Sequence, residues 1–230
     1  MSAPATAKKS IAADLIAMGH AMKPETRRLL KGITWNEYQE LSAAFPDSAK
    51  LRMAFHEGTL EVATSSFMRE RRKASLSGLV SLFAGEMEIE MTGAGSTTLA
   101  LESKQCAIEP DCSFYVAHAR QMFGCKELDL ERYPPPDVVV EVYDDHPSWD
   151  KRVIYAQFRV PELWRVVGDD ATFYALERNA YQEKENSLSF PVLTPPMLTR
   201  FLKESFAVGQ TQALRDFGDW LKSHLREACP

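Results

Sequence analysis

The stretch Pro134-Pro135-Pro136-Asp137-Val138-Val139-Val140-Glu141-Val142 decides the fold of this chain. The three prolines favour an extended lead, and the nearly continuous valine run after them is typical of a central strand covered on both faces. Glu141 is the exception within the run, because an unpaired carboxylate is costly to bury. Such a group is neutralised, paired with a cation or bound to a metal. Glu141 therefore marks either a functional site or an ion pair with an Arg or Lys of a neighbouring helix.

The segments around this run predict alternating helices and strands. Thr34 and Glu37 have the spacing of a capping box at a helix start, and residues 50–55 and 59–62 alternate in polarity like the two strands of a hairpin. The spacing of apolar residues predicts further helices over 67–87, 150–158 and 210–225. Further strands are expected over 97–101, 107–116, 162–167 and 172–177, with 187–193 either a last strand or an extended segment. This order predicts an α/β fold, with a mixed central β-sheet flanked by α-helices.

Composition narrows the classes of function. The chain has 230 residues, of which 45% are hydrophobic and 26% charged, as in an ordinary globular protein. No apolar run approaches the roughly 20 residues of a membrane span. The N-terminal stretch is also too polar for a signal peptide, so we expect no membrane partner and a cytoplasmic location. The formal net charge is −5, so nucleic-acid binding requires a local basic patch.

A second acid accompanies Glu141. Asp111 follows Pro110 at the edge of another predicted strand, 30 residues upstream of Glu141. If the two strands are neighbours, two carboxylates point into one site and need a cation between them, for which Mg²⁺ or Mn²⁺ is suited. Lys151 begins the next predicted helix, ten residues after Glu141. Two acids, a lysine and a divalent ion are the groups required for phosphodiester hydrolysis.

Several motifs resemble one family in order and spacing. They are Gly-Ser-Thr-Thr at 95–98, Glu-Pro-Asp at 109–111 and Pro-Glu-Leu-Trp-Arg at 161–165. Over about residues 33 to 203 the chain resembles the Uma2 family, also called DUF820, of the PD-(D/E)xK nuclease superfamily. The resemblance implies a restriction-endonuclease-like core and metal-dependent cleavage of DNA. It covers a nuclease domain over 32–205. The Ala- and Lys-rich residues 1–31 are expected to form a loose or partly helical N-terminal arm, and the apolar spacing near the end predicts a C-terminal amphipathic helix over 206–230.

The resemblance assigns roles to individual residues. Asp111 and Glu141 are the implied ligands of Mg²⁺ or Mn²⁺, Lys151 is the signature lysine, and Glu70 is an accessory acid. Three positions depart from the family pattern. Tyr143 stands where the superfamily motif has lysine, Arg69 where the family often has His, and His56 where it often has Asp. These departures leave open a weakened or catalytically silent member that acts by DNA or protein binding. A metal-dependent phosphoesterase on small substrates is a third alternative.

Basic residues surround Glu70. Alone, such a cluster is typical of a solvated helix face. If Glu70 faces a metal, however, its neighbours Arg71, Arg72 and Lys73 lie beside the cleft and become candidates for contact with DNA phosphates. Trp164 is expected in the core. DNA is the expected partner, and a homodimer is possible.

Overall fold

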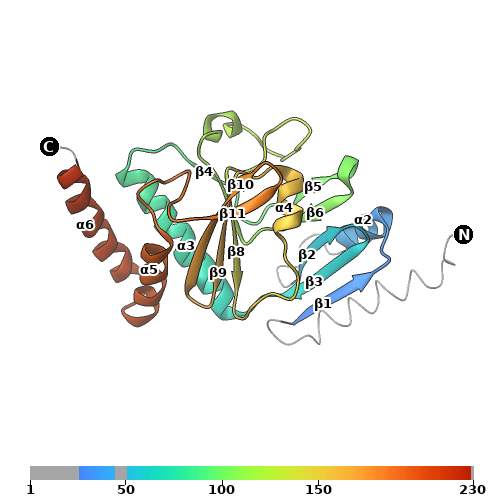
Figure 1. Ribbon diagram of the computed structural model, residues 1–230, viewed down its shortest axis with the longest axis horizontal. Coiled ribbons are helices and arrows are strands. Elements are labelled where there is room, and N and C mark those ends of the chain that lie inside the picture. Colours follow the sequence, from blue (N-terminus) through green and yellow to red (C-terminus); the bar gives the residue numbers. More distant parts are fainter. Residues whose placement is uncertain (1–25, 45–50, 229–230) are drawn as a thin grey trace, which may run out of the picture. The chain divides into compact units, whose positions relative to one another are not determined.

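The computed structural model describes residues 26–44 and 51–228, with side chains up to residue 223. The chain divides into two compact units (Figure 1). The first contains the described residues up to Phe67 together with Ala100–Glu109, and the second contains Met68–Leu99 and the chain from Pro110 onward. Of the predicted arm over 1–31, only residues 26–31 lie within the described part.

The first unit is built on a sheet in the order β1-β3-β2-β6-β5. The strands are β1 (Arg27–Lys31), β2 (Leu51–His56), β3 (Thr59–Thr64), β5 (Leu99–Leu101) and β6 (Cys106–Ile108), and a short 3-10 helix, η1 (Glu102–Lys104), follows β5. Helix α2 (Trp35–Ala44) begins at the predicted capping box, where the Thr34 backbone N–H donates to Glu37 Oε2 at 2.9 Å and the Glu37 N–H donates to Thr34 Oγ1 at 3.3 Å. The hairpin of β2 and β3 is confirmed, and Gly58 takes a positive φ in its turn.

The second unit is a mixed six-stranded sheet with helices, in the order β11-β10-β9-β8-β7-β4. Its strands are β4 (Thr92–Gly93), β7 (Cys112–Tyr115), β8 (Val138–Tyr143), β9 (Glu162–Val167), β10 (Asp170–Glu177) and β11 (Ala180–Lys184). Its helices are α3 (Phe67–Glu86), the 3-10 helix η2 (Ala119–Met122), α4 (Arg152–Phe158), α5 (Pro195–Ala207) and α6 (Gln210–Ala228). Strands β8 and β9 are parallel, and the other pairings are antiparallel. The predicted α/β fold with a mixed sheet and flanking helices is confirmed.

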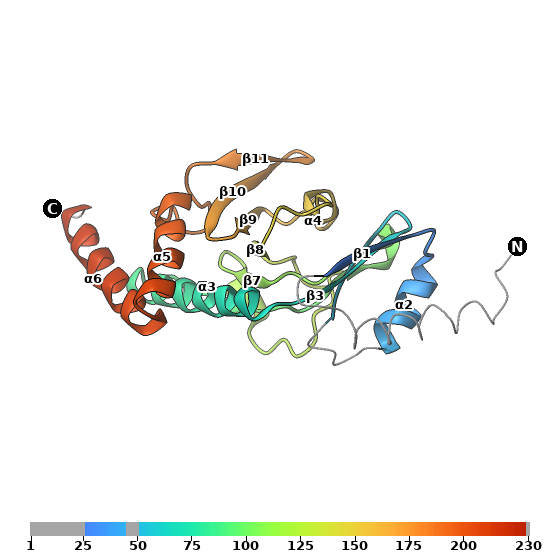
Figure 2. The same cartoon turned by 90° about the horizontal axis from the view of Figure 1, so that it is seen from below.

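Strand β8 is the central strand that the valine run predicts, and all six of its residues are buried. Val140 and Val142 pack with Trp164 and Val166 of β9 into a core that also contains apolar side chains of α3, α5 and α6. Because side chains alternate along a strand, Glu141 points to the opposite face, which is the face of α4. Figure 2 shows α3 and α4 on opposite sides of β8 and β9. Helices α3, α5 and α6 thus cover the apolar face of the sheet, and α4 covers the face that carries Glu141.

Some boundaries differ from the predicted ones. The predicted strand over 107–116 is two strands in different sheets, because Pro110, between β6 and β7, has no N–H for a ladder and interrupts the strand. Residues 187–193 form no strand, and the last strand of the sheet is β11 instead. Helix α5 was not predicted, although Thr194 caps it and prolines occupy its first turn. None of the helices in the described ranges is long and apolar enough to be a candidate membrane span.

Trp164 lies in the core, as predicted, and tests the packing of the second unit. Its ring stacks on Phe173 at a centroid distance of 4.7 Å, and its Nε1–H donates to Glu162 Oε1 at 2.6 Å. Trp164→Ala should lower the free energy of unfolding by about 3–5 kcal/mol, because it leaves a cavity. Urea denaturation followed by circular dichroism measures the loss. Val153→Ala, at an exposed position of α4, is the control and should cost less than about 1 kcal/mol.

Candidate functional site

Glu141 is buried between two partners supplied by the next helix. Its Oε1 accepts a hydrogen bond from the Tyr155 hydroxyl at 2.5 Å, and its Oε2 accepts one from Lys151 Nζ at 3.3 Å. Lys151 stands at the N-cap of α4, so the loop after β8 returns the chain directly over Glu141. Burial, and then the charge of Glu141, raise the pKa of Tyr155 well above its usual value, so Tyr155 remains a proton donor. The structure therefore brings together Glu141 and Lys151, which the sequence predicted as site residues.

Asp111 is held by an arginine of α3. Arg69 Nη2 donates to Asp111 Oδ2 at 2.8 Å, and Arg69 Nε lies 3.0 Å from Oδ1. The backbone N–H of Val142 donates to the same Oδ2 at 2.7 Å. Both side chains of the pair are only 1% exposed. Burial raises the pKa of the Asp111 carboxyl, but the charge and hydrogen bonds of Arg69, with the Val142 N–H and the charge of Lys73, hold that pKa below its usual value. Asp111 is therefore an ionised carboxylate locked to a guanidinium.

Glu70, the predicted accessory acid, points toward solvent and is held by Lys73. Lys73 Nζ donates to Glu70 Oε2 at 2.9 Å and lies 3.9 Å from Asp111 Oδ1. We use "charged centre" for the six residues Arg69, Glu70, Lys73, Asp111, Glu141 and Lys151. Its three carboxylates face three cations, so its formal charge is zero.

The charged centre, as it lies, does not fit a divalent ion. Mg²⁺ requires several oxygen ligands at about 2.0–2.1 Å and gives up its water reluctantly. Both oxygens of Asp111 accept hydrogen bonds from Arg69, and the two oxygens of Glu141 accept one each from Tyr155 and Lys151. Across the described residues, no three His, Cys, Asp or Glu side chains form a group that could hold a metal. The carboxylates have the right chemistry for Mg²⁺ or Mn²⁺, but cations of the chain already neutralise them.

The predicted DNA-contact residues have partners within the second unit. Arg72 is buried and bridges Asp144 at 2.5 Å and Asp169 at 3.0 Å. Arg71 donates to the Ser205 carbonyl at 3.1 Å, and its guanidinium lies 4.1 Å from the centroid of the Phe206 ring. Together with Lys73, which is bonded to Glu70, these side chains connect α3 to neighbouring segments and do not form an open basic patch.

The burial of Arg69, Arg72 and Lys73 could have been predicted from the helical spacing of α3. The buried apolar stripe of α3 includes Leu76, Leu79, Val80 and Phe83. Continued toward the N-terminus at the same spacing, this stripe reaches Lys73, Arg72 and Arg69. Cations on the core-facing stripe of a helix need acidic partners, whereas Glu70 lies off the stripe and is exposed.

A polar pocket opens beside Glu141 and Lys151, with a volume of about 250 Å³. Its other lining residues are Tyr143, His146, Pro147, Trp149, Asp150, Arg152, Leu163 and Arg165. Arg165 of β9 is the register partner of Glu141 in β8, so both side chains lie on the same face of the sheet. Arg165 is not among the predicted site residues. The feature that could have identified Arg165 is its position in β9, directly beside Glu141, the one acid of the valine run.

The charges of this pocket are unevenly paired. Arg152 forms a double hydrogen bond with Asp150, which lowers the pKa of the Asp150 carboxyl. Arg152 and Arg165 both lie against the Tyr174 ring, at 4.9 and 5.2 Å from its centroid. The buried Nε of Arg165 has no hydrogen-bond partner among the described residues. Arg165 therefore keeps one N–H without an acceptor among the described residues, while its charge also helps to lower the pKa of the Asp150 carboxyl.

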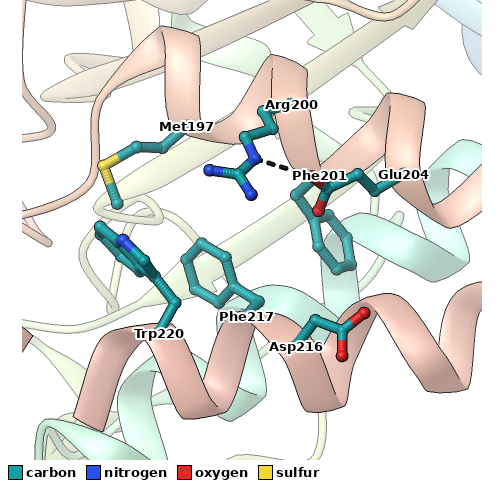
Figure 3. Close-up of a pocket in the computed structure, with 7 residues that line it drawn as sticks. All are labelled: Met197, Arg200, Phe201, Glu204, Asp216, Phe217 and Trp220. Atoms are coloured by element: carbon teal, nitrogen blue, oxygen red, sulfur yellow. Dashed lines mark hydrogen bonds and ion pairs between the residues drawn. The ribbon is translucent and has the colours of Figure 1, made fainter. Parts of the chain in front are cut away.

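A second pocket, of about 90 Å³, lies between α5 and α6 (Figure 3). Met197, Phe201, Phe217 and Trp220 give it an apolar lining, and Arg200 pairs with Glu204 at 2.7 Å on its α5 side. None of the predicted site residues lines it.

Comparisons with known proteins agree with the resemblance noted in the sequence. The model of the Uma2 family, described as "Putative restriction endonuclease", matches residues 35–205. Among solved structures, the chain is similar to a "putative nuclease belonging to DUF820" from Anabaena variabilis, with 13% identity, a TM-score of 0.47 and coverage of 74% of this chain and 99% of that one. No curated protein matches the chain.

The pairing of Arg69 with Asp111 predicts a particular pattern of stability. Asp111→Leu should lower the free energy of unfolding by about 3–5 kcal/mol, because it leaves a buried guanidinium without its carboxylate. Arg69→Met should lower it by a similar amount, because it leaves the buried Asp111 carboxylate without its guanidinium. The double variant should cost less than the sum of the two single variants, since neither charge is then left alone. Urea denaturation of the four proteins measures this coupling, and strictly additive losses would contradict it.

Proposed function

This chain belongs to the Uma2 family, and on that premise we propose that it binds DNA by taking a backbone phosphate into the pocket beside Glu141. The observation that carries the proposal is Arg165, whose buried Nε lacks a hydrogen-bond partner among the described residues. A phosphate oxygen is the acceptor that a guanidinium prefers. The family supports nucleic acid as the source of that phosphate.

The surroundings of Arg165 favour an anion. Three cations, Lys151, Arg152 and Arg165, line the pocket with two carboxylates, Glu141 and Asp150. Arg152 and Arg165 lie against the same ring, so a bound anion would offset the repulsion between them. The volume of about 250 Å³ suits one phosphate and an adjoining sugar better than a whole base pair. Trp149 offers an aromatic surface on which a neighbouring base could stack.

A second candidate function is hydrolysis of the bound strand by a Mg²⁺- or Mn²⁺-dependent endodeoxyribonuclease centred on Asp111, Glu141 and Lys151. The contact of Lys151 with Glu141 at the wall of the proposed phosphate pocket supports it. The pairing of Asp111 with Arg69 opposes it, because the two acids are not open to one ion. The geometry thus supports DNA binding better than DNA cleavage.

Removing the charge of Arg165 tests the binding proposal. Arg165→Gln should weaken the binding of a fluorescent DNA duplex to a similar extent for unrelated sequences, because a phosphate contact carries no sequence information. The plot of log affinity against log salt should also flatten by about 0.9, the contribution of one neutralised phosphate. Fluorescence anisotropy in EDTA over a series of salt concentrations measures both effects.

Arg200→Gln is the matched control, because Arg200 lies on the surface of α5 and is paired with Glu204. It should bind DNA like the unaltered protein. Equal affinities and salt slopes for Arg165→Gln and the unaltered protein would contradict the assignment of Arg165.

A plasmid-nicking assay distinguishes the two candidate functions. For a binding protein, supercoiled DNA should remain intact in Mg²⁺, Mn²⁺ and EDTA alike. For an endonuclease, nicking should depend on the metal, and Lys151→Ala should slow it about 10²-fold or more, as with the loss of other preorganised charge stabilisers. Metal-dependent nicking that disappears in Lys151→Ala would replace the first candidate by the second.

A further inference from the structure

We propose that the guanidinium of Arg69 takes the place of a divalent cation at Asp111, so that the chain folds with a charged centre complete without metal. This inference concerns metal binding alone and does not depend on whether the protein binds DNA. It rests on the contacts, burial and charge balance of the residues around Asp111.

The contacts at Asp111 leave little room for another cation. Oδ2 accepts hydrogen bonds from Arg69 Nη2 at 2.8 Å and from the Val142 N–H at 2.7 Å. Oδ1 accepts one from Arg69 Nε at 3.0 Å and has Lys73 Nζ at 3.9 Å. The planar guanidinium thus meets both oxygens of the carboxylate at once, the bidentate geometry for which arginine is suited. Oδ2 is fully engaged by these donors, and an ion at the remaining lone pair of Oδ1 would lie beside the ammonium group of Lys73.

Displacement of Arg69 is opposed by its burial. Arg69 is 1% exposed at the start of α3, so a displaced guanidinium would lose its carboxylate in a setting with little access to water. Its neighbours on the buried stripe are also engaged, because Arg72 holds Asp144 and Asp169, and Lys73 holds Glu70. Within the described part of the chain, the carboxylates beside these neighbours are therefore already paired.

Charge balance leads to the same conclusion. With three carboxylates and three cations, the charged centre has no excess negative charge to attract a dication. Removal of Arg69 leaves an excess of one negative charge at Asp111, beside Glu141 on the adjoining strand. The Asp111 carboxylate freed in this way, with Glu141 on the adjoining strand, would favour a new cation. Replacement of Arg69 by a neutral side chain should therefore create the metal site that the unaltered chain lacks.

The test compares the full-length protein with Arg69→Gln, using Mn²⁺ and Mg²⁺ in the absence of DNA. Melting is followed by calorimetry in metal, in EDTA and in NaCl of matched ionic strength. Bound Mn²⁺ is counted by electron paramagnetic resonance. The unaltered protein should show no metal-specific shift. Arg69→Gln should melt about 3–6 °C higher when the metal is at ten times its dissociation constant, with about one Mn²⁺ bound per chain.

Two further variants locate the effect. In Arg69→Gln/Asp111→Asn, both the shift and the bound Mn²⁺ should disappear, because Asp111 is then no longer a carboxylate. Arg69→Met, with an unbranched apolar side chain that suits the buried position, replaces Arg69→Gln if the glutamine variant does not fold.

The inference is overturned by either of two results. One is that the unaltered protein binds Mn²⁺ and that Asp111→Asn abolishes this binding, which can be measured without any Arg69 variant. The other is that a folded Arg69 variant binds no Mn²⁺. Neither result bears on DNA affinity measured in EDTA, so this inference and the proposed DNA binding succeed or fail separately.

Discussion

The buried ion pair of Arg69 and Asp111 is the interaction on which the charged centre depends. It joins the first turn of α3 to the residue before β7, and through the Val142 N–H it also fixes the end of β8. Asp111 further extends the pairing of β7 with β8 by donating its own N–H to the Val140 carbonyl at 3.0 Å. Movement of the Asp111 carboxylate would therefore disturb α3, the start of β7 and the end of β8 together.

This constraint divides the acids of the centre into two sets. Asp111 is neutralised from the α3 side by Arg69, whereas Glu141 is neutralised from the α4 side by Lys151 and Tyr155. Each carboxylate is paired with groups of the second unit. The two carboxylates therefore have neighbouring backbones but no shared cation, and the mutual repulsion inferred from the sequence is relieved by two separate pairs.

The sequence predicted the parts of the fold that are governed by local patterns. The valine run gave the central strand, the spacing of Leu76, Leu79 and Phe83 gave α3, and the residue types gave Glu141 and Lys151 as neighbours. These predictions succeed because burial and periodicity are properties of a single segment. The predicted strand over 107–116 failed at Pro110, since the sheet to which each half belongs depends on distant partners.

The partner of Asp111 could not be deduced in the same way. Five consecutive residues, 69 to 73, include four cations and Glu70, and the motif directed attention to Glu70 as an accessory acid. Which cation reaches Asp111 depends on the rotation of α3 about its axis, and this is set by the packing of Leu76 and Phe83 farther along. The buried stripe was therefore a better guide to the site than the motif.

The presence of acids and a lysine in the motif positions has a physical explanation that does not require hydrolysis. Once Arg69 is paired with Asp111 in a site closed to water, loss of either partner leaves a buried charge uncompensated, at a cost of about 3–5 kcal/mol. That is a large share of the 5–15 kcal/mol by which a typical domain is stable. The same reasoning applies to Glu141 with Lys151, which are 1% and 5% exposed. Stability alone is thus sufficient to retain Asp111, Glu141 and Lys151, so their presence in the sequence is not by itself evidence of catalysis.

Arg165 is different, because its Nε has no hydrogen-bond partner within the described part of the chain and the contacts of the charged centre do not require it. A cation that the fold leaves incompletely satisfied in a pocket is better evidence for a ligand than carboxylates whose charges the fold has already balanced.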